Sequence, residues 1–369
     1  MKRPASAVDA SDHQCELKAS RADLRSRRLA GRFGAVVDSL STRDLSDERI
    51  TKLLVELWMD AGGLLVVQGL NGLTPRELSD FSEHFGTLHT SHEVPSEYYI
   101  PGYPIMRMGN AKDVNGRLMC YLANRQQVLD GESLQFNPET QLPNYHTDSV
   151  FWERPPVGSL FYCKQAPAEG GETLFADTTA AFDALPEEKR CRLAEYEVVC
   201  SLAHQWAKKN KSAAHKALAH KSREDLLAAR VRSPARRWPL VSCHPVTARK
   251  SIYGMNMGTC AVVPKGERIA EQEMDKFELD GVEDESLQVL KDLLPHISQP
   301  SFGITGLSST LALVLMTKDT REKCGGLRYL QSNHKMLDET LACVRGSAAQ
   351  SCLRGHCLNT VMRALDVLT

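Results

Sequence analysis

Hydrophobic residues at helical spacing form the first clear pattern in the chain. Between residues 47 and 60 the apolar side chains fall on one face of a predicted helix, at Ile50, Leu53, Leu54, Leu57 and Trp58. Gly62 and Gly63 end this helix, because glycine is a poor helix former. Residues 64–67 are continuously apolar, which predicts a short buried strand.

A second helix begins with a start signal of its own. Thr74 takes the cap position and Pro75 the first turn, and Gly86 ends the helix after Phe85. Farther along, the pattern predicts strands at residues 103–108, 157–164 and 197–201, helices beginning at residues 178 and 186, and a longer helix at 277–294. The chain is therefore expected to mix short buried strands with helices.

The composition is that of a globular protein. The chain has 369 residues, 42% of them hydrophobic, enough for one large domain or two ordinary ones. A net charge of -1 gives no overall attraction to nucleic acid or to an anionic membrane. No apolar run approaches the roughly 20 residues that span a bilayer. We therefore expect a small-molecule partner, no nucleic acid and no membrane; the sequence leaves open whether the protein forms a homo-oligomer.

Cysteine usage and the N-terminal stretch bear on the compartment. The 11 cysteines contain no Cys-x-x-Cys pair, so we expect reduced thiols rather than disulfides or a zinc ribbon. Residues 1–35 are predicted to be a flexible arm, and residues 36–369 a single domain. Residues 21–32 are arginine-rich like a mitochondrial transit peptide, but the acidic residues in the arm argue against one. A cytoplasmic location is expected, with a mitochondrial one as the weaker alternative.

A His-x-Asp motif at residues 146–148 is the main candidate for chemistry. In an extended strand, residues two apart point the same way, so His146 and Asp148 share a face while Thr147 points to the other. One imidazole and one carboxylate are two-thirds of the facial triad that holds non-haem Fe(II). The third ligand must come from a distant part of the sequence.

The context of the motif carries a family resemblance. His146-Thr147-Asp148 is followed by residues 151–156, by Gly158-Ser159-Leu160-Phe161-Tyr162 and by the segment 170–177. This block, and the helix, strand and capped helix that begin near residue 45, resemble the taurine dioxygenase and 2,4-dichlorophenoxyacetate dioxygenase (TauD/TfdA) family. The resemblance implies an α+β protein whose core is a double-stranded β-helix, a jelly-roll, with Fe(II) as cofactor and 2-oxoglutarate and O2 as co-substrates. It also implies that the Thr173 hydroxyl contacts 2-oxoglutarate.

A second block resembling this family begins at His244. Family members usually have His-Pro-x-Thr-Gly-Arg-Lys in this place, a tight turn before an apolar strand. Here Ala248 takes the position of the usual turn glycine. We interpret His244 as structural, because the third ligand in the family lies much nearer the C-terminus.

The expected third metal ligand is the point at which this sequence departs from the family. The family has an Asp-Asn on its closing strand and a histidine shortly after it. Aligned on Asn333 and Leu337, that histidine position is occupied by Asp338. Asp338 can itself bind a hard divalent ion, and His334 is the alternative. Since residues 334 and 338 of a strand lie about 13 Å apart, only one can reach the ion.

The arginine that pairs with 2-oxoglutarate in the family is displaced as well. Aligned on Leu353 and Gly355, its position falls on Ser351. Arg354 or Arg345 is a candidate replacement, because a guanidinium binds a carboxylate through two parallel hydrogen bonds. An alternative interpretation is that residues 303–332 come from a divergent or mis-assembled coding segment.

Residues 204–237 are the most basic part of the chain. Two tryptophans, Trp206 and Trp238, only flank the lysines and arginines, whereas single-stranded nucleic acid binding favours interleaved aromatic residues. We therefore interpret the segment as a solvated helical insertion.

Two functions follow from these observations. The first is an Fe(II)- and 2-oxoglutarate-dependent dioxygenase that hydroxylates a small anionic or zwitterionic metabolite, with a metal site made of His146, Asp148 and either Asp338 or His334. The alternative is a catalytically impaired family member that binds a small acid or a protein partner without turnover.

Overall fold

The computed structural model describes most of the chain before residue 305 and three short strands after it. The described residues are 24–29, 33–38, 40–91, 94–109, 113–117, 119–120, 145–164, 173–211, 220–244, 247–304, 313–317, 329–333 and 359–365. Among the helices in these ranges, none is both long and apolar enough to cross a lipid bilayer.

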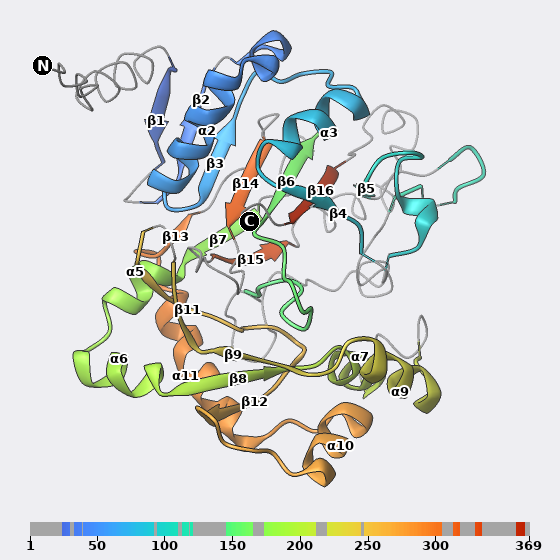
Figure 1. The fold of residues 1–369 in the computed structure, drawn as a ribbon, viewed down its shortest axis with the longest axis vertical. Helices are drawn as coiled ribbons and strands as arrows, with labels where there is room; N and C mark the ends of the chain where they lie inside the picture. Colours follow the sequence, from blue (N-terminus) through green and yellow to red (C-terminus); the bar gives the residue numbers. More distant parts are fainter. Residues whose placement is uncertain are drawn as a thin grey trace, which may run out of the picture.

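An eight-stranded sheet forms the upper layer of the structure in Figure 1. Its strands follow the order β1 (Ser26–Arg28), β2 (Ala35–Val37), β3 (Leu64–Val67), β14 (Leu313–Thr317), β6 (Gly158–Cys163), β16 (Asn359–Leu365) and β4 (Thr87–His89), and β5 (Ile105–Met108) also pairs with β16. Neighbouring strands are antiparallel except β2 and β3, which are parallel. The expected strands at residues 64–67, 103–108 and 157–164 are thus confirmed.

Two helices cover one face of this sheet. Helix α2 (Glu48–Asp60) begins at Asp47, whose side chain accepts a hydrogen bond from the backbone N–H of Arg49. Helix α3 (Pro75–Glu83) begins at Thr74, which forms a capping box with Glu77. The Thr74 start signal was predicted from the sequence, although α3 ends two residues before Phe85, whereas the Asp47 cap was not singled out. The apolar faces of both helices share one buried cluster with β2, β3, β5 and β6.

The opposite face of the large sheet packs against a second sheet. Strand β7 (Thr173–Asp177) lies between β13 (Gly303–Ile304) and β15 (Tyr329–Asn333), antiparallel to both. Along β3, side chains alternate between the two faces, so Leu65 contacts the helix side while Leu64 and Val66 face away. There they join Phe175 of β7 in a buried cluster. The two sheets therefore stack face to face across apolar side chains.

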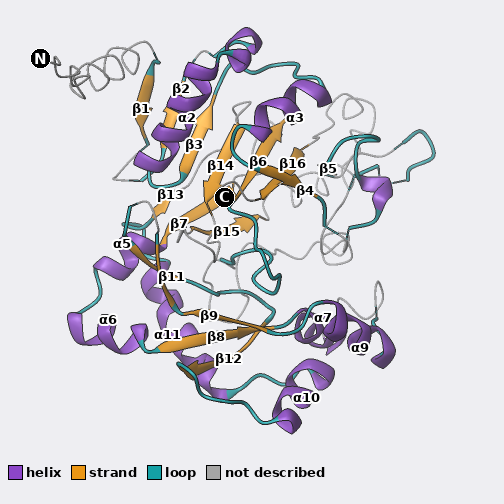
Figure 2. Cartoon of the chain, viewed as in Figure 1, coloured by secondary structure: helices purple, strands orange, loops and turns teal. Residues whose placement is uncertain are grey.

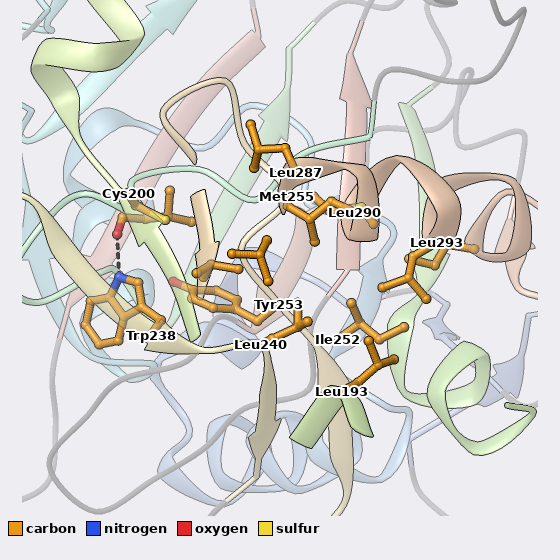
Figure 3. Close-up of a cluster of buried hydrophobic side chains, with 14 of the residues drawn as sticks. Leu193, Cys200, Trp238, Leu240, Ile252, Tyr253, Met255, Leu287, Leu290 and Leu293 are labelled. Carbon is orange, nitrogen blue, oxygen red and sulfur yellow. Dashed lines mark hydrogen bonds between the residues drawn. The ribbon is translucent and has the colours of Figure 1, made fainter. Parts of the chain in front are cut away.

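Residues 178–297 form a helix-rich lobe, shown below the sheets in Figure 2. Its strands are β8 (Tyr196–Cys200), β9 (Arg236–Pro239), β10 (Val241–Cys243), β11 (Lys250–Ile252) and β12 (Thr259–Pro264). Its helices are α5 (Thr178–Asp183), α6 (Glu187–Ala194), α7 (Leu202–Lys211), α9 (Arg223–Arg232), α10 (Glu271–Asp280) and α11 (Gln288–Ile297). Short 3₁₀ turns are η1 (Thr42–Ser46), η2 (Ser96–Tyr98) and, inside the lobe, η3 (Glu285–Leu287). Figure 3 shows the buried cluster in which β9, β11 and α11 meet around Trp238 and Tyr253.

The prediction of a single helix at residues 277–294 is wrong. The chain instead forms α10, η3 and α11, because Gly281 adopts a left-handed backbone (φ 58°) that ends α10. The Asp284 side chain then accepts a hydrogen bond from Ser286 N and starts a new turn. The leucines that suggested one long helix belong to η3 and α11.

The N-terminal boundary also differs from the expectation. Residues 26–28, inside the expected arm of residues 1–35, form β1 and pair with residues 35–37 of β2. The C-terminal part of that arm therefore belongs to the large sheet. Residues 1–23 lie outside the described residues, as does the end of the chain, so the extent of the single domain proposed for 36–369 stays a prediction.

The basic segment 204–237 packs as helices α7 and α9 against the acidic helix α10. Arg230 contacts Asp275 and Glu278, in both cases at 2.6 Å, and Lys208 forms an ion pair with Glu283. Burial raises the pKa of Glu278, while its hydrogen bonds from Ser201 and Arg230 oppose that shift. The positive charges of Arg230 and Lys208 are therefore matched by carboxylates of the lobe itself.

We expect Gly281→Ala to destabilise the lobe strongly. A Cβ there would lie 2.7 Å from the backbone of residues 207 and 208, in a left-handed conformation that alanine adopts poorly. The free energy of unfolding should fall by about 3 kcal/mol, from backbone strain and overpacking together. Gly266→Ala is the control, since Gly266 also has a positive φ but nothing within 4 Å. It should cost only about 1 kcal/mol in chemical denaturation; equal losses would contradict this account.

Candidate metal centre

His146 and Asp148 meet in space. The His146 Nε2 atom lies 3.2 Å from Asp148 Oδ1, and the two side chains are 30% and 32% exposed. Of the three motif residues, only His146 is in a strand-like bridge, and the chain turns from Asp148 onward. The prediction that the two side chains share a face is confirmed, while their role as metal ligands stays a prediction.

This spacing fits one octahedral metal ion. Two neighbouring ligand atoms on such an ion, with bonds of about 2.1 Å, lie about 3 Å apart. A neutral imidazole nitrogen and a carboxylate oxygen are also the donor types that suit Fe(II). Within the part of the chain that the structure describes, no group of three His, Cys, Asp or Glu residues could hold a metal. The described residues thus offer two candidate metal donors, His146 and Asp148, and no third.

The remaining candidates for the site fall largely outside the described residues. His334, Asp338, Arg345 and Arg354 all lie there. The last described residue before them, Asn333, ends β15 directly opposite Thr173, the first residue of β7. Thr173 is half-buried at this end of the second sheet. The described segment 329–333 therefore ends at Asn333, beside Thr173, one residue before His334.

The peptide groups on both sides of Thr147 are fixed by the loop after β11. Thr147 N donates to Met255 O at 2.7 Å, and Asn256 Nδ2 donates to Thr147 O at 2.6 Å. The Thr147 side chain is 1% exposed. It is buried, unlike the partly exposed His146 and Asp148, and its Oγ1 has no hydrogen-bond partner among the described residues.

The chain that follows the motif is anchored in the lobe. Ser149 has a positive φ of 58°, which reverses the chain and directs Val150 and Phe151 into the buried cluster. Trp238 Nε1 donates to Val150 O at 2.5 Å, the dashed line in Figure 3. Ser233 Oγ donates to Phe151 O at 2.9 Å. Residues 147–151 are thus held through their backbone by the lobe.

These anchoring residues were missed in the sequence. Trp238 was noted only as a flank of the basic segment, and Ser233 and Asn256 were not singled out. The one available signal was the Asn-Met-Gly turn at residues 256–258, a typical loop composition. A turn signal does not reveal which distant strand the asparagine contacts.

Tyr145 connects the motif to the second sheet. Its hydroxyl lies 3.8 Å from where a Cβ on Gly303 would be, and Gly303 pairs with Ala176 of β7. Burial raises the pKa of the Tyr145 phenol above its ordinary value. A phenol is protonated at neutral pH, so Tyr145 can donate a hydrogen bond into its surroundings, and burial strengthens its preference for the neutral form.

His244 lies in the turn between β10 and β11. It is 2% exposed, its Nδ1 accepts a hydrogen bond from Thr247 N at 3.0 Å, and its backbone bonds to residues 248 and 249 close the turn. These contacts agree with its interpretation as a structural residue.

Comparison with known proteins identifies the family. A sequence model of the "Taurine catabolism dioxygenase TauD, TfdA family" matches residues 25–303, more than half of the chain. This chain belongs to the TauD/TfdA family. The match includes His146, Asp148 and Thr173 and ends at residue 303, where the resemblance read from the sequence also weakens.

Two relatives of this TauD/TfdA protein are dioxygenases. An alpha-ketoglutarate-dependent sulfonate dioxygenase of Saccharomyces cerevisiae is 24% identical over 253 residues, 68% of this chain and 53% of the yeast protein. An (S)-phenoxypropionate/alpha-ketoglutarate-dioxygenase of Sphingobium herbicidovorans is 26% identical over 226 residues, 61% of this chain and 68% of that protein. The match thus spans about half the length of the yeast relative.

Solved structures of the same kind share the fold. A taurine dioxygenase from Burkholderia xenovorans superposes with a TM-score of 0.57 at 14% identity, covering 94% of this chain and 90% of that one. AAD-2, solved in complex with Mn(II) and N-oxalylglycine, also gives 0.57, at 19% identity and with 94% and 99% coverage. At these identities the likeness establishes the fold, a mixed α and β architecture.

We expect Thr147→Val to stabilise this family member. The substitution removes a buried hydroxyl that lacks a partner among the described residues and keeps the branched shape. The free energy of unfolding should rise by about 1 kcal/mol. Thr259→Val is the matched control, because the Thr259 hydroxyl is equally buried but donates to Gly254 O. Chemical denaturation should show a loss of about 1–2 kcal/mol for the control; a loss for both variants would refute the argument.

Ala248→Gly should also stabilise the protein. Ala248 has a φ of 55°, the left-handed conformation that glycine adopts without strain. Relief of about 1–2 kcal/mol of strain, less the extra chain entropy of glycine, predicts a gain of about 0.5–1 kcal/mol in unfolding free energy. Ala184→Gly, at an ordinary φ of -79°, is the control and should lower stability. No difference between the two variants in thermal unfolding would exclude strain at Ala248.

Proposed function

We propose that this protein is an Fe(II)- and 2-oxoglutarate-dependent dioxygenase. The observation that carries the proposal is the 3.2 Å separation of His146 Nε2 and Asp148 Oδ1 on a partly exposed surface. The family match supports it, because it covers the whole segment around this pair. The stacking of the large sheet on the β7 sheet supports a double-stranded β-helix core with the metal at one open end.

The chain's own residues have separate tasks in this proposal. His146 and Asp148 hold the ion, with Asp338 or His334 as the third ligand. The Thr173 hydroxyl orients 2-oxoglutarate, and the Arg354 guanidinium pairs with its distal carboxylate. When bound, Fe(II) with 2-oxoglutarate and O2 supplies the oxidising chemistry that the side chains lack. The anchored backbone of residues 147–151 keeps the two described ligands in place before the ion arrives.

We infer that the substrate is a small organic anion or zwitterion that becomes hydroxylated. The printed names of the two relatives support this class, since a sulfonate and a phenoxypropionate are both organic acids. The alternative is an impaired member that binds a small acid without turnover. Its only support is that Asp338 takes the position of the family's histidine ligand and Ser351 the position of its arginine. The paired His146 and Asp148 favour the enzyme.

Anaerobic titration of Fe(II) with 2-oxoglutarate tests the proposal. The wild-type protein should develop the weak visible charge-transfer band of the chelate, and His146→Ala and Asp148→Ala should each abolish it. Loss of a direct ligand should weaken binding by more than the 10–100-fold that an outer-shell change costs. Comparing Asp338→Ala with His334→Ala identifies the third ligand, because only one of them should remove the band.

The controls for this titration are His84→Ala and Asp80→Ala. Both side chains are exposed at the end of α3, so the band should persist in these variants. A folded wild-type protein that shows no band and consumes no 2-oxoglutarate would reject the dioxygenase in favour of the impaired alternative.

A further inference from the structure

Asn256 makes a two-sided amide contact in the loop between β11 and β12. Its Nδ2 donates to Thr147 O at 2.6 Å, and its Oδ1 accepts from Gly258 N at 2.7 Å. A backbone N–H can only donate, so the amide oxygen must face Gly258. The NH2 group is therefore directed at Thr147, whose carbonyl can only accept.

The contact acts on the peptide unit between the two candidate ligands. Thr147 C=O belongs to the peptide bond that leads to Asp148, and Thr147 N–H belongs to the one that comes from His146. Asn256 holds the first, and Met255 O holds the second at 2.7 Å. With both peptide planes fixed, the Cα positions of His146 and Asp148 are fixed relative to each other.

The loop that carries Asn256 cannot move away easily. A Cβ on Gly258 would lie 3.0 Å from Ser201 O, 3.1 Å from a Phe151 ring carbon and 3.2 Å from Asn256 Oδ1. Ser201 N also donates to Gly258 O at 2.8 Å. The loop is thus packed between Ser201, the residue after β8, and Phe151 in the segment that follows the motif.

We propose that Asn256 is a positioning residue that sets the spacing of His146 and Asp148 for the metal ion. The inference rests on the proposed function, since it concerns the same site. The Asn256 amide contacts Thr147 O and Gly258 N, and acts on the two candidate ligands through the Thr147 carbonyl. Outer-shell residues usually orient a metal ligand by a hydrogen bond to its side chain. Asn256 would do so by a hydrogen bond to the backbone between two ligands.

Titration of the metal-free protein with Mn(II), followed by the electron paramagnetic resonance of free Mn(II), tests the inference without turnover. Asn256→Asp keeps the acceptor for Gly258 N and replaces the donor to Thr147 O by an oxygen. We expect at least about tenfold weaker Mn(II) binding. The added negative charge would by itself attract a cation, so a loss of affinity must come from the broken contact. Asn256→Ala, which adds no charge, should show the same loss and decides the matter if Asn256→Asp does not fold.

Asn210→Asp is the matched control. Asn210 makes the same kind of two-sided amide contact, to Lys221 O at 2.8 Å and from Lys221 N at 2.9 Å, on α7. Its Mn(II) affinity should stay within about twofold of the wild type. Wild-type affinity in a folded Asn256 variant, or an equal loss in Asn210→Asp, would overturn the inference. If His146→Ala binds Mn(II) as tightly as wild type, the proposed metal site itself fails, a result distinct from failure of Asn256 alone.

Discussion

The hydrogen bonds between residues 147–151 and the helix-rich lobe are the constraint on which the site depends. Four backbone groups of this segment bond to partners in the lobe: Met255, Asn256, Trp238 and Ser233. Buried backbone groups must find partners somewhere, and here the partners come from strands and loops more than 80 positions away. The spacing of His146 and Asp148 is therefore a property of the folded lobe as much as of the motif.

Strand β7 ties this lobe to the two stacked sheets. Phe175 packs between the sheets, and Asp177 at the end of the strand caps α5 by accepting hydrogen bonds from Thr179 N and Ala180 N. Burial raises the pKa of Asp177, while these hydrogen bonds and the charge of Arg249 oppose that shift. One short strand thus carries a candidate co-substrate residue at its start, the inter-sheet core in its middle and a helix cap at its end.

The part of the chain that matches the family and the part that departs from it meet near residue 303. The matched residues 25–303 include the anchored motif and the lobe that holds it. Beyond residue 303, β15 still pairs with β7 in the antiparallel register that places Asn333 opposite Thr173. The two candidate third ligands, His334 and Asp338, follow β15 closely in the sequence.

The sequence by itself determined the elements whose signals are local. Thr74 marks a helix start because a cap contacts N–H groups within three residues. The spacing of two residues between His146 and Asp148 was enough to bring them together, although only residue 146 is in a strand-like bridge. The division of the predicted 277–294 helix at Gly281 and Asp284 also rests on local signals, which the helical spacing of the leucines concealed. The role of Asn256 was decided only by the tertiary structure. Asn256 and Thr147 are 109 positions apart, and no periodicity or cap encodes a contact over that distance.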